Sequence, residues 1–166
     1  MPQLPGLIDY ATSDSKSDEN DFILMSHCSF FIGSNSGANW IAIVQQRRIL
    51  VVNVVPMAVA KIWTSRDLAV PKLHRRKSDD SEVSFNEIFE GDMADFQMSY
   101  KYENAGVYVV DNTDDEILNA VMEFYGMVID GKEFSASERD LQNRYDALFT
   151  ARNFGYYSKS QISPYF

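Results

Sequence analysis

The chain has 166 residues, of which 45% are hydrophobic and 13% aromatic, and its formal net charge is −9. This length and apolar content predict one domain with a core and exclude an intrinsically disordered chain. The net charge argues against general affinity for nucleic acids or anionic membranes. Between Arg47 and Lys77, however, eight basic residues accompany a single acidic one. That segment indicates a small anionic ligand or, alternatively, a solvated basic loop.

Three features predict a cytoplasmic protein without an integral membrane segment. Cys28 is the only cysteine, which excludes an intrachain disulfide and favours a reducing compartment; we interpret it as a small buried residue. No apolar run approaches the ~20 residues that span a bilayer. The first residues show neither the basic nor the apolar region of a signal peptide.

The first half of the chain predicts a strand, a helix and a second strand. Residues 1–20 form a loop-rich start, and Asp21 begins a short helix that runs to Met25. Continuous apolar runs at 29–32 and 49–52 predict buried strands of a parallel sheet. Residues 38–44 between them fit a helix, whose Trp40 we expect in the core rather than as a stacking platform for a base. Together these elements predict a βαβ unit.

The second half predicts further helices and one more strand. Residues 56–80 are basic and suggest irregular structure, and 106–110 form a third strand. Ser84, Thr113 and Ser135 each precede a glutamate by three residues, the spacing of a capping box. These boxes predict helices over 84–89, from 113 to about 126, and from 135 to about 151. With 152–166 packed back as a tail, residues 1–166 form a single three-layer α/β domain with a mainly parallel sheet.

The turn Gly33-Ser34-Asn35-Ser36-Gly37, between the first strand and the following helix, suits a phosphate or similar anion. Glycines let an anion approach the backbone N–H groups of a helix N-terminus, and Ser34 and Ser36 add hydroxyl donors. The turn lacks the lysine of a P-loop, the glycine spacing of a dinucleotide fingerprint and the central serine of a nucleophile elbow. The alternative is a tight turn in which Ser or Asn caps the helix and no ligand binds.

The stretches 8–11, 21–24, 28–37 and 49–53 resemble a bacterial family of proposed glycosyltransferases of the GT-B fold, associated with surface polysaccharide synthesis. The resemblance continues through Lys72, 84–88 and 112–117 and so covers most of the chain. The turn is also similar to the Asp-Ser-Gly turn of heptosyltransferases, although Asn35 stands where those enzymes have an acid. The chain then corresponds to a Rossmann-like C-terminal donor-binding domain.

The resemblance implies a site for a nucleotide diphosphate sugar, with no other cofactor. Gly33, Ser34, Ser36 and Gly37 would hold the diphosphate, and Asn35 would lie near the sugar. Asn53 would line the same crevice, and Lys72 or Arg75 would neutralise the charge of the leaving group, unless these cations belong to a surface loop. Glu87 would bind a ribose hydroxyl or serve only its capping box. No Asp-x-Asp pair indicates a metal.

A GT-B enzyme has two domains, and the resemblance covers only one of them. The acceptor domain and the catalytic base are not accounted for, so no catalytic residue is assigned. We therefore expect a glycosyltransferase donor domain that is weakly active or inactive unless a separate chain, a second domain or a homo-oligomer completes it. The alternative is a non-catalytic α/β interaction module with an exposed apolar patch. A hydrolase is disfavoured, because no nucleophile elbow exists and no histidine follows His74.

Overall fold

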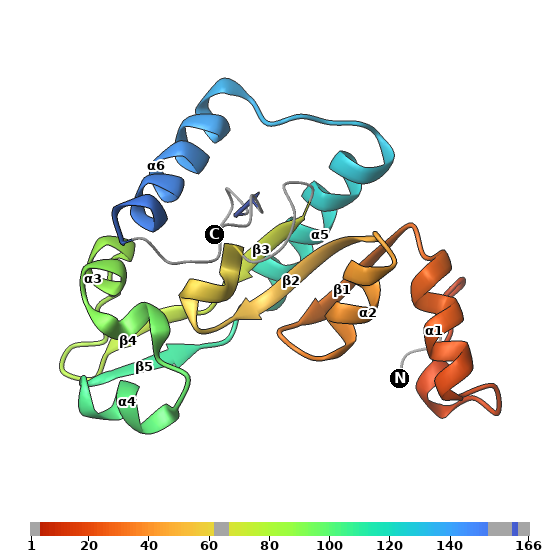
Figure 1. The fold of residues 1–166 in the computed structure, drawn as a ribbon, viewed down its shortest axis with the longest axis horizontal. Helices are drawn as coiled ribbons and strands as arrows, with labels where there is room; N and C mark the ends of the chain where they lie inside the picture. Colours follow the sequence, from red (N-terminus) through yellow and green to blue (C-terminus); the bar gives the residue numbers. More distant parts are fainter. Residues whose placement is uncertain (1–3, 62–66, 153–160, 163–166) are drawn as a thin grey trace.

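The computed structural model describes residues 4–61, 67–152 and 161–162 and is an α/β structure (Figure 1). Its main sheet is parallel and has the order β1-β2-β3-β6, with β1 at Phe30–Ser34, β2 at Arg48–Val54, β3 at Leu68–Pro71 and β6 at Gln161–Ile162. A second sheet pairs β4, Leu73–Arg76, with β5, Val107–Val110, in antiparallel register. The parallel sheet with helices is compatible with a Rossmann-like fold.

The predicted βαβ unit is confirmed. Helix α2, Ala38–Val44, connects β1 to β2, which pair in parallel from Phe30 opposite Arg48 to Ser34 opposite Val52. Strand β2 is buried almost throughout. Because side chains alternate along a strand, Ile49 and Val51 enter one apolar cluster, whereas Leu50 and Val52 enter another on the opposite face.

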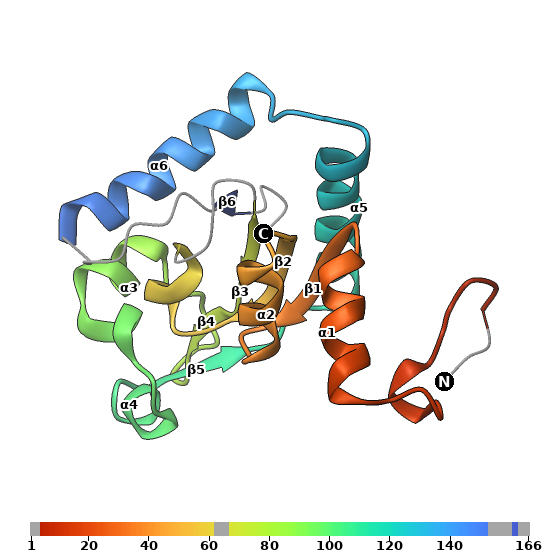
Figure 2. The same ribbon diagram turned by 45° about the vertical axis from the view of Figure 1, so that its right-hand side comes forward.

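Helices cover both faces of this sheet, and Figure 2 shows α2 and α5 (Asp114–Ile129) on opposite sides of it. Ala42 of α2 packs in the first cluster with residues of α3 (Phe85–Glu90) and α6 (Ala136–Arg152), whereas Phe124 of α5 packs in the second. The remaining helical elements lie around these layers. The helices are α1 Asp18–His27, α3 Phe85–Glu90, α4 Ser99–Asn104, α5 Asp114–Ile129 and α6 Ala136–Arg152, with 3-10 turns at Tyr10–Thr12, Met57–Lys61 and Asp92–Asp95.

The three predicted capping boxes are confirmed. The hydroxyls of Ser84, Thr113 and Ser135 each accept the N–H of the glutamate three residues on, and that glutamate accepts the N–H of the cap. Helix α5 runs to Ile129, three residues past the expected end near Gly126. Gly126 is buried in the last turns, where the side chain of Lys132 packs on it.

The prediction of irregular structure over 56–80 is wrong, because this segment contains β3 and β4. Strand β3 is buried and forms the third parallel strand of the main sheet. The strand predicted at 106–110 exists as β5, but it pairs only with β4 among the described strands. Proline is uncommon inside strands, so Pro71 at the end of β3 concealed this short element from a sequence pattern.

Four local expectations also need correction. Helix α1 begins at Asp18 after the Ser17 cap, not at Asp21, and Cys28 is half-buried. Among the described strands β1 lies at the edge of the sheet, and it has no buried residue, so the prediction of a buried strand is wrong there. Trp40 is 56% exposed, because Asn39 and Ala42 are the residues of α2 that face inward.

Two expectations concern the tail and the membrane. Of residues 152–166, Arg152 ends α6 and residues 161–162 pair with β3; the rest of the predicted tail lies outside the described residues. Within the described part of the chain, none of the helices combines the length and apolar character needed to cross a bilayer.

Candidate functional site

The Ser/Gly turn lies where β1 ends and α2 begins. Ser34 is the last residue of β1, and the exposed residues Asn35, Ser36 and Gly37 connect it to Ala38. Gly37 is the N-cap of α2 and, as a glycine, has no side chain to accept an N–H group of the first turn. Ser or Asn therefore does not cap this helix, although a tight turn that binds no ligand is still the alternative. Because α2 has only seven residues, an anion at this turn needs charge from elsewhere.

The two glycines of the turn have different surroundings. A Cβ on Gly33 would lie 2.7 Å from a ring carbon of Phe31 and 2.9 Å from Oδ1 of Asn39, so the close packing of β1 on α2 requires glycine there. Gly37 has an ordinary helical φ of −59°, and no described atom lies within 4 Å of its hypothetical Cβ. Neither backbone strain nor packing explains glycine at 37, whereas access for a ligand would.

The carboxyl ends of the parallel strands meet beside this turn. Nδ2 of Asn35 donates to the carbonyl of Val55, just after β2, at 3.4 Å. The N–H of Lys72, just after β3, donates to the carbonyl of Val54 at 3.0 Å. A cavity of about 380 Å³ lies next to these strand ends, with Val55, Pro56 and Lys72 in its wall but none of the turn residues among its described lining. Open α/β sheets place their ligands at this edge.

The cavity combines one cation with aromatic walls. Lys72 has a side chain that is 22% exposed, and it forms an ion pair with Asp111, whose side chain is 72% exposed. An ion pair this open to water contributes at most about 1 kcal/mol, so an anionic ligand could take over the ammonium group. The remaining lining includes the rings of Phe96, Tyr102 and Tyr108, the polar side chains of Gln97 and Ser99, and the carboxylate of Glu103, which pairs with Lys77.

Asn53 has a structural role at the same edge. It has a φ of +56°, a left-handed conformation that asparagine tolerates, where the register between β2 and β3 shifts. Its N–H donates to Oδ1 of Asn112 and its Oδ1 accepts the N–H of Asn112, both at 2.6 Å. Nδ2 of Asn112 also donates to the carbonyl of Pro71. Asn112, which the sequence did not single out as a site residue, thus joins the ends of β2 and β3 to the segment after β5.

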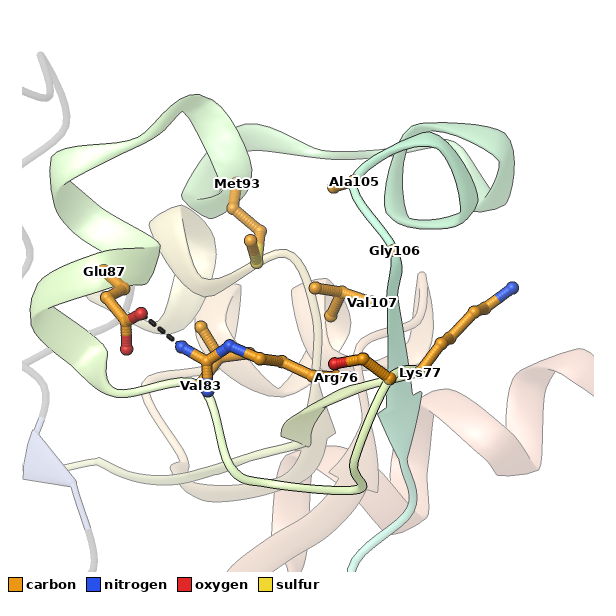
Figure 3. Close-up of a pocket in the computed structure, with 9 residues that line it drawn as sticks. Arg76, Lys77, Val83, Glu87, Met93, Ala105, Gly106 and Val107 are labelled. Atoms are coloured by element: carbon orange, nitrogen blue, oxygen red, sulfur yellow. Dashed lines mark hydrogen bonds and ion pairs between the residues drawn. The ribbon is translucent and has the colours of Figure 1, made fainter.

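Arg75 and Glu87 lie apart from the turn. Arg75 of β4 pairs with Asp80 at 3.0 Å and with Glu82 at 3.6 Å, two residues that follow β4 in the chain. Glu87 closes the Ser84 capping box and pairs with Arg76, and hydrogen bonds from Ser84 and then Arg76 hold the pKa of its carboxyl below the usual value. Figure 3 shows Arg76 reaching Glu87 across a second cavity of about 550 Å³, with Met93 and Val107 in its wall.

His74 is a buried titratable residue that the sequence patterns did not single out. It is 2% exposed, its Nδ1 lies 3.1 Å from the carbonyl of Lys72, and its Nε2 has no partner among the described residues. Burial lowers the pKa of its imidazole. The ring of Tyr102 lies 5.5 Å away, and burial raises the pKa of that phenol to about 12. His74 therefore supports the strand that follows Lys72 as a neutral ring.

No cluster of three potential metal ligands occurs among the described residues. No known protein family, curated protein or solved structure matches this chain. The interpretation of the site therefore depends on its own geometry and on the sequence patterns above.

Proposed function

We propose that this chain binds a nucleotide diphosphate sugar at the carboxyl edge of its parallel sheet, as the donor-binding unit of a glycosyltransferase of the GT-B type. The observation that carries the proposal is the convergence of three consecutive parallel strands on one edge. There Asn35 of the turn bonds to the carbonyl of Val55, and Val55 and Lys72 both line the adjoining cavity.

Each part of this edge matches one part of such a ligand. Ser34, Ser36 and the open backbone at Gly37 would donate hydrogen bonds to the diphosphate, and Lys72 would neutralise its charge. The half-buried ring of Phe96 and its aromatic neighbours offer apolar surface for a flat or cyclic group. Asn35, which already bridges to Val55, would lie between these two regions.

The donor roles of Asn53, Arg75 and Glu87 remain predictions with weaker support. Asn53 uses both its N–H and its side-chain oxygen in the contact with Asn112, and Arg75 and Glu87 form ion pairs elsewhere. The proposal therefore depends on the turn and on Lys72. Sugar transfer would also need a general base and an acceptor site, which we propose a second domain or chain supplies.

Isothermal titration calorimetry with UDP, GDP and ADP tests the binding proposal. We expect one of the three to bind, and we expect Gly37→Trp to weaken that binding at least about tenfold, because an indole would occupy the position of the diphosphate. Gly37→Ala is the matched comparison, since a methyl group meets no described atom of the chain, and it should weaken binding less than the indole does. Lys72→Met should also weaken binding, and more strongly at low salt.

Absence of binding by all three nucleotides would contradict the proposal. So would equal affinities of the Gly37→Trp variant and the unaltered chain, because the ligand would then lie away from the turn.

The second candidate function is the non-catalytic interaction module. It is favoured by exposed apolar side chains on α1, α2 and α5, including Phe22, Trp40 and Met122. This function predicts protein association without nucleotide binding, whereas a donor domain predicts nucleotide binding whether or not the chain associates.

A further inference from the structure

Strand β1 has the sequence of a buried strand but lies at a sheet edge. It pairs only with β2 among the described strands, and its Ile32 is 40% exposed. Phe30–Ser34 contains no charged residue and no proline, which are the features that usually prevent an edge strand from pairing with another chain. The free side of β1 is therefore suited to accept a further strand.

The neighbouring helix α5 has an exposed apolar stripe formed by Leu118, Met122, Tyr125 and Ile129, which we call the α5 seam. The spacing of four, three and four residues is that of the a and d positions through which two helices pack together. The buried face of α5, with Ala120 and Phe124, points elsewhere, to the second apolar cluster. The α5 seam therefore fits another helix.

The seam and the strand edge are adjacent. The ring of Tyr125 contacts that of Phe30 with centroids 6.4 Å apart, so the seam begins on the flank of α5 beside β1. Helix α1, which leads directly into β1, is also apolar near this edge. It exposes Phe22 and Leu24 and has no buried residue among those described. A second copy of this chain presents the same combination of a strand edge with exposed apolar helices, so its surface matches this region.

We propose that the free edge of β1 and the α5 seam form the interface of a symmetric dimer with a second copy of this chain. A two-fold axis perpendicular to the sheet would set β1 antiparallel to β1 of the second copy and place seam against seam, so each layer meets its own counterpart. Such closed two-fold contacts are the commonest form of homo-oligomer. The uncharged seam and strand also let two chains of net charge −9 meet without repulsion at the centre of the contact.

Sedimentation velocity on the full chain tests the dimer over roughly 1–200 μM, a range that spans the affinities of transient and stable interfaces. We expect a concentration-dependent dimer. Met122→Glu in the seam and Ile32→Lys on the edge should each raise its dissociation constant at least about tenfold, because each places an unpaired charge in an apolar contact. Asn119→Glu is the matched control, because residue 119 is an exposed position of α5 outside the seam.

Hydrogen exchange provides the second readout. The amides of Phe30–Ser34 should exchange more slowly at high protein concentration in the unaltered chain, but not in Met122→Glu. Circular dichroism would establish that both variants are folded. A chain that stays monomeric over the whole range overturns the proposal, whatever other molecule binds this surface. A dimer unaffected by both substitutions overturns it as well. Neither outcome depends on nucleotide binding, so the two proposals are tested separately.

Discussion

Gly33, inside β1, and Gly37, at the N-cap of α2, lie on the two sides of the turn and have different surroundings. We expect Gly33→Ala to lower the free energy of unfolding by about 1–3 kcal/mol, since the added methyl overlaps the Phe31 ring and the amide of Asn39. Gly37→Ala should change it by less than about 0.5 kcal/mol, because the methyl points into open space. Urea denaturation of both variants measures the difference. Equal stabilities would show that the β1–α2 packing adjusts to a side chain.

His74 predicts an acid-sensitive component of stability. Burial lowers the pKa of its imidazole in the folded chain, so the unfolded chain binds a proton first as the pH falls. The corresponding stabilisation is present above the unfolded pKa of about 6.5 and is lost as the pH falls from there towards the folded pKa. Tyr102 beside it stays neutral in this range, because its pKa is raised to about 12.

The measurement is the urea stability of the chain and of His74→Gln between about pH 5 and pH 8, the range around the ordinary pKa of histidine. We expect the unaltered chain to lose more stability on acidification than the variant does. If both curves fall equally, other groups cause the acid sensitivity.

Among the secondary-structure elements, Asn112 joins three segments. We expect Asn112→Ala to lower the free energy of unfolding by about 1–3 kcal/mol, because it leaves the N–H of Asn53 and the carbonyl of Pro71 without their buried partner. Asp111→Ala, one residue away and mostly exposed, is the control and should have little effect. Chemical denaturation of both variants checks this. A smaller loss in Asn112→Ala than in Asp111→Ala would contradict the role assigned to Asn112.

Elements specified by local chemistry were predicted well, and elements specified by their partners were not. The capping boxes at Ser84, Thr113 and Ser135 depend on residues three positions apart, so the sequence was sufficient to predict where those helices begin. The pairing of β4 with β5 joins Leu73 to Val110 across 37 positions (110 − 73). Nothing in the sequence of β5 shows whether it pairs with β4 or joins the parallel sheet, so the sheet to which β5 belongs was not predictable.

For the whole molecule, the sequence predicts one domain, and the arrangement of the clusters leads us to expect one unfolding transition. The two apolar clusters lie on opposite faces of β2 and β3 and share these strands, so neither should persist without the other. Far-ultraviolet and near-ultraviolet circular dichroism should give the same midpoint in urea. Two separate transitions would indicate that the β4–β5 region, or α6, unfolds independently.

The sequence by itself determined the βαβ unit, the starts of the three helices with capping boxes and the position of the Ser/Gly turn after a strand, because periodicity, caps and glycines act within a few residues. Only the tertiary structure decided that β3 belongs to the main sheet, that β1 is an edge strand, and that Lys72 lies at the turn's edge of the sheet while Arg75 and Glu87 do not. The physical reason is that an apolar run such as 29–32 has the same local pattern in an edge strand and in a central strand. A charged side chain likewise shows the same pattern whether it lies at the site or elsewhere. Their surroundings come from segments far away in the chain.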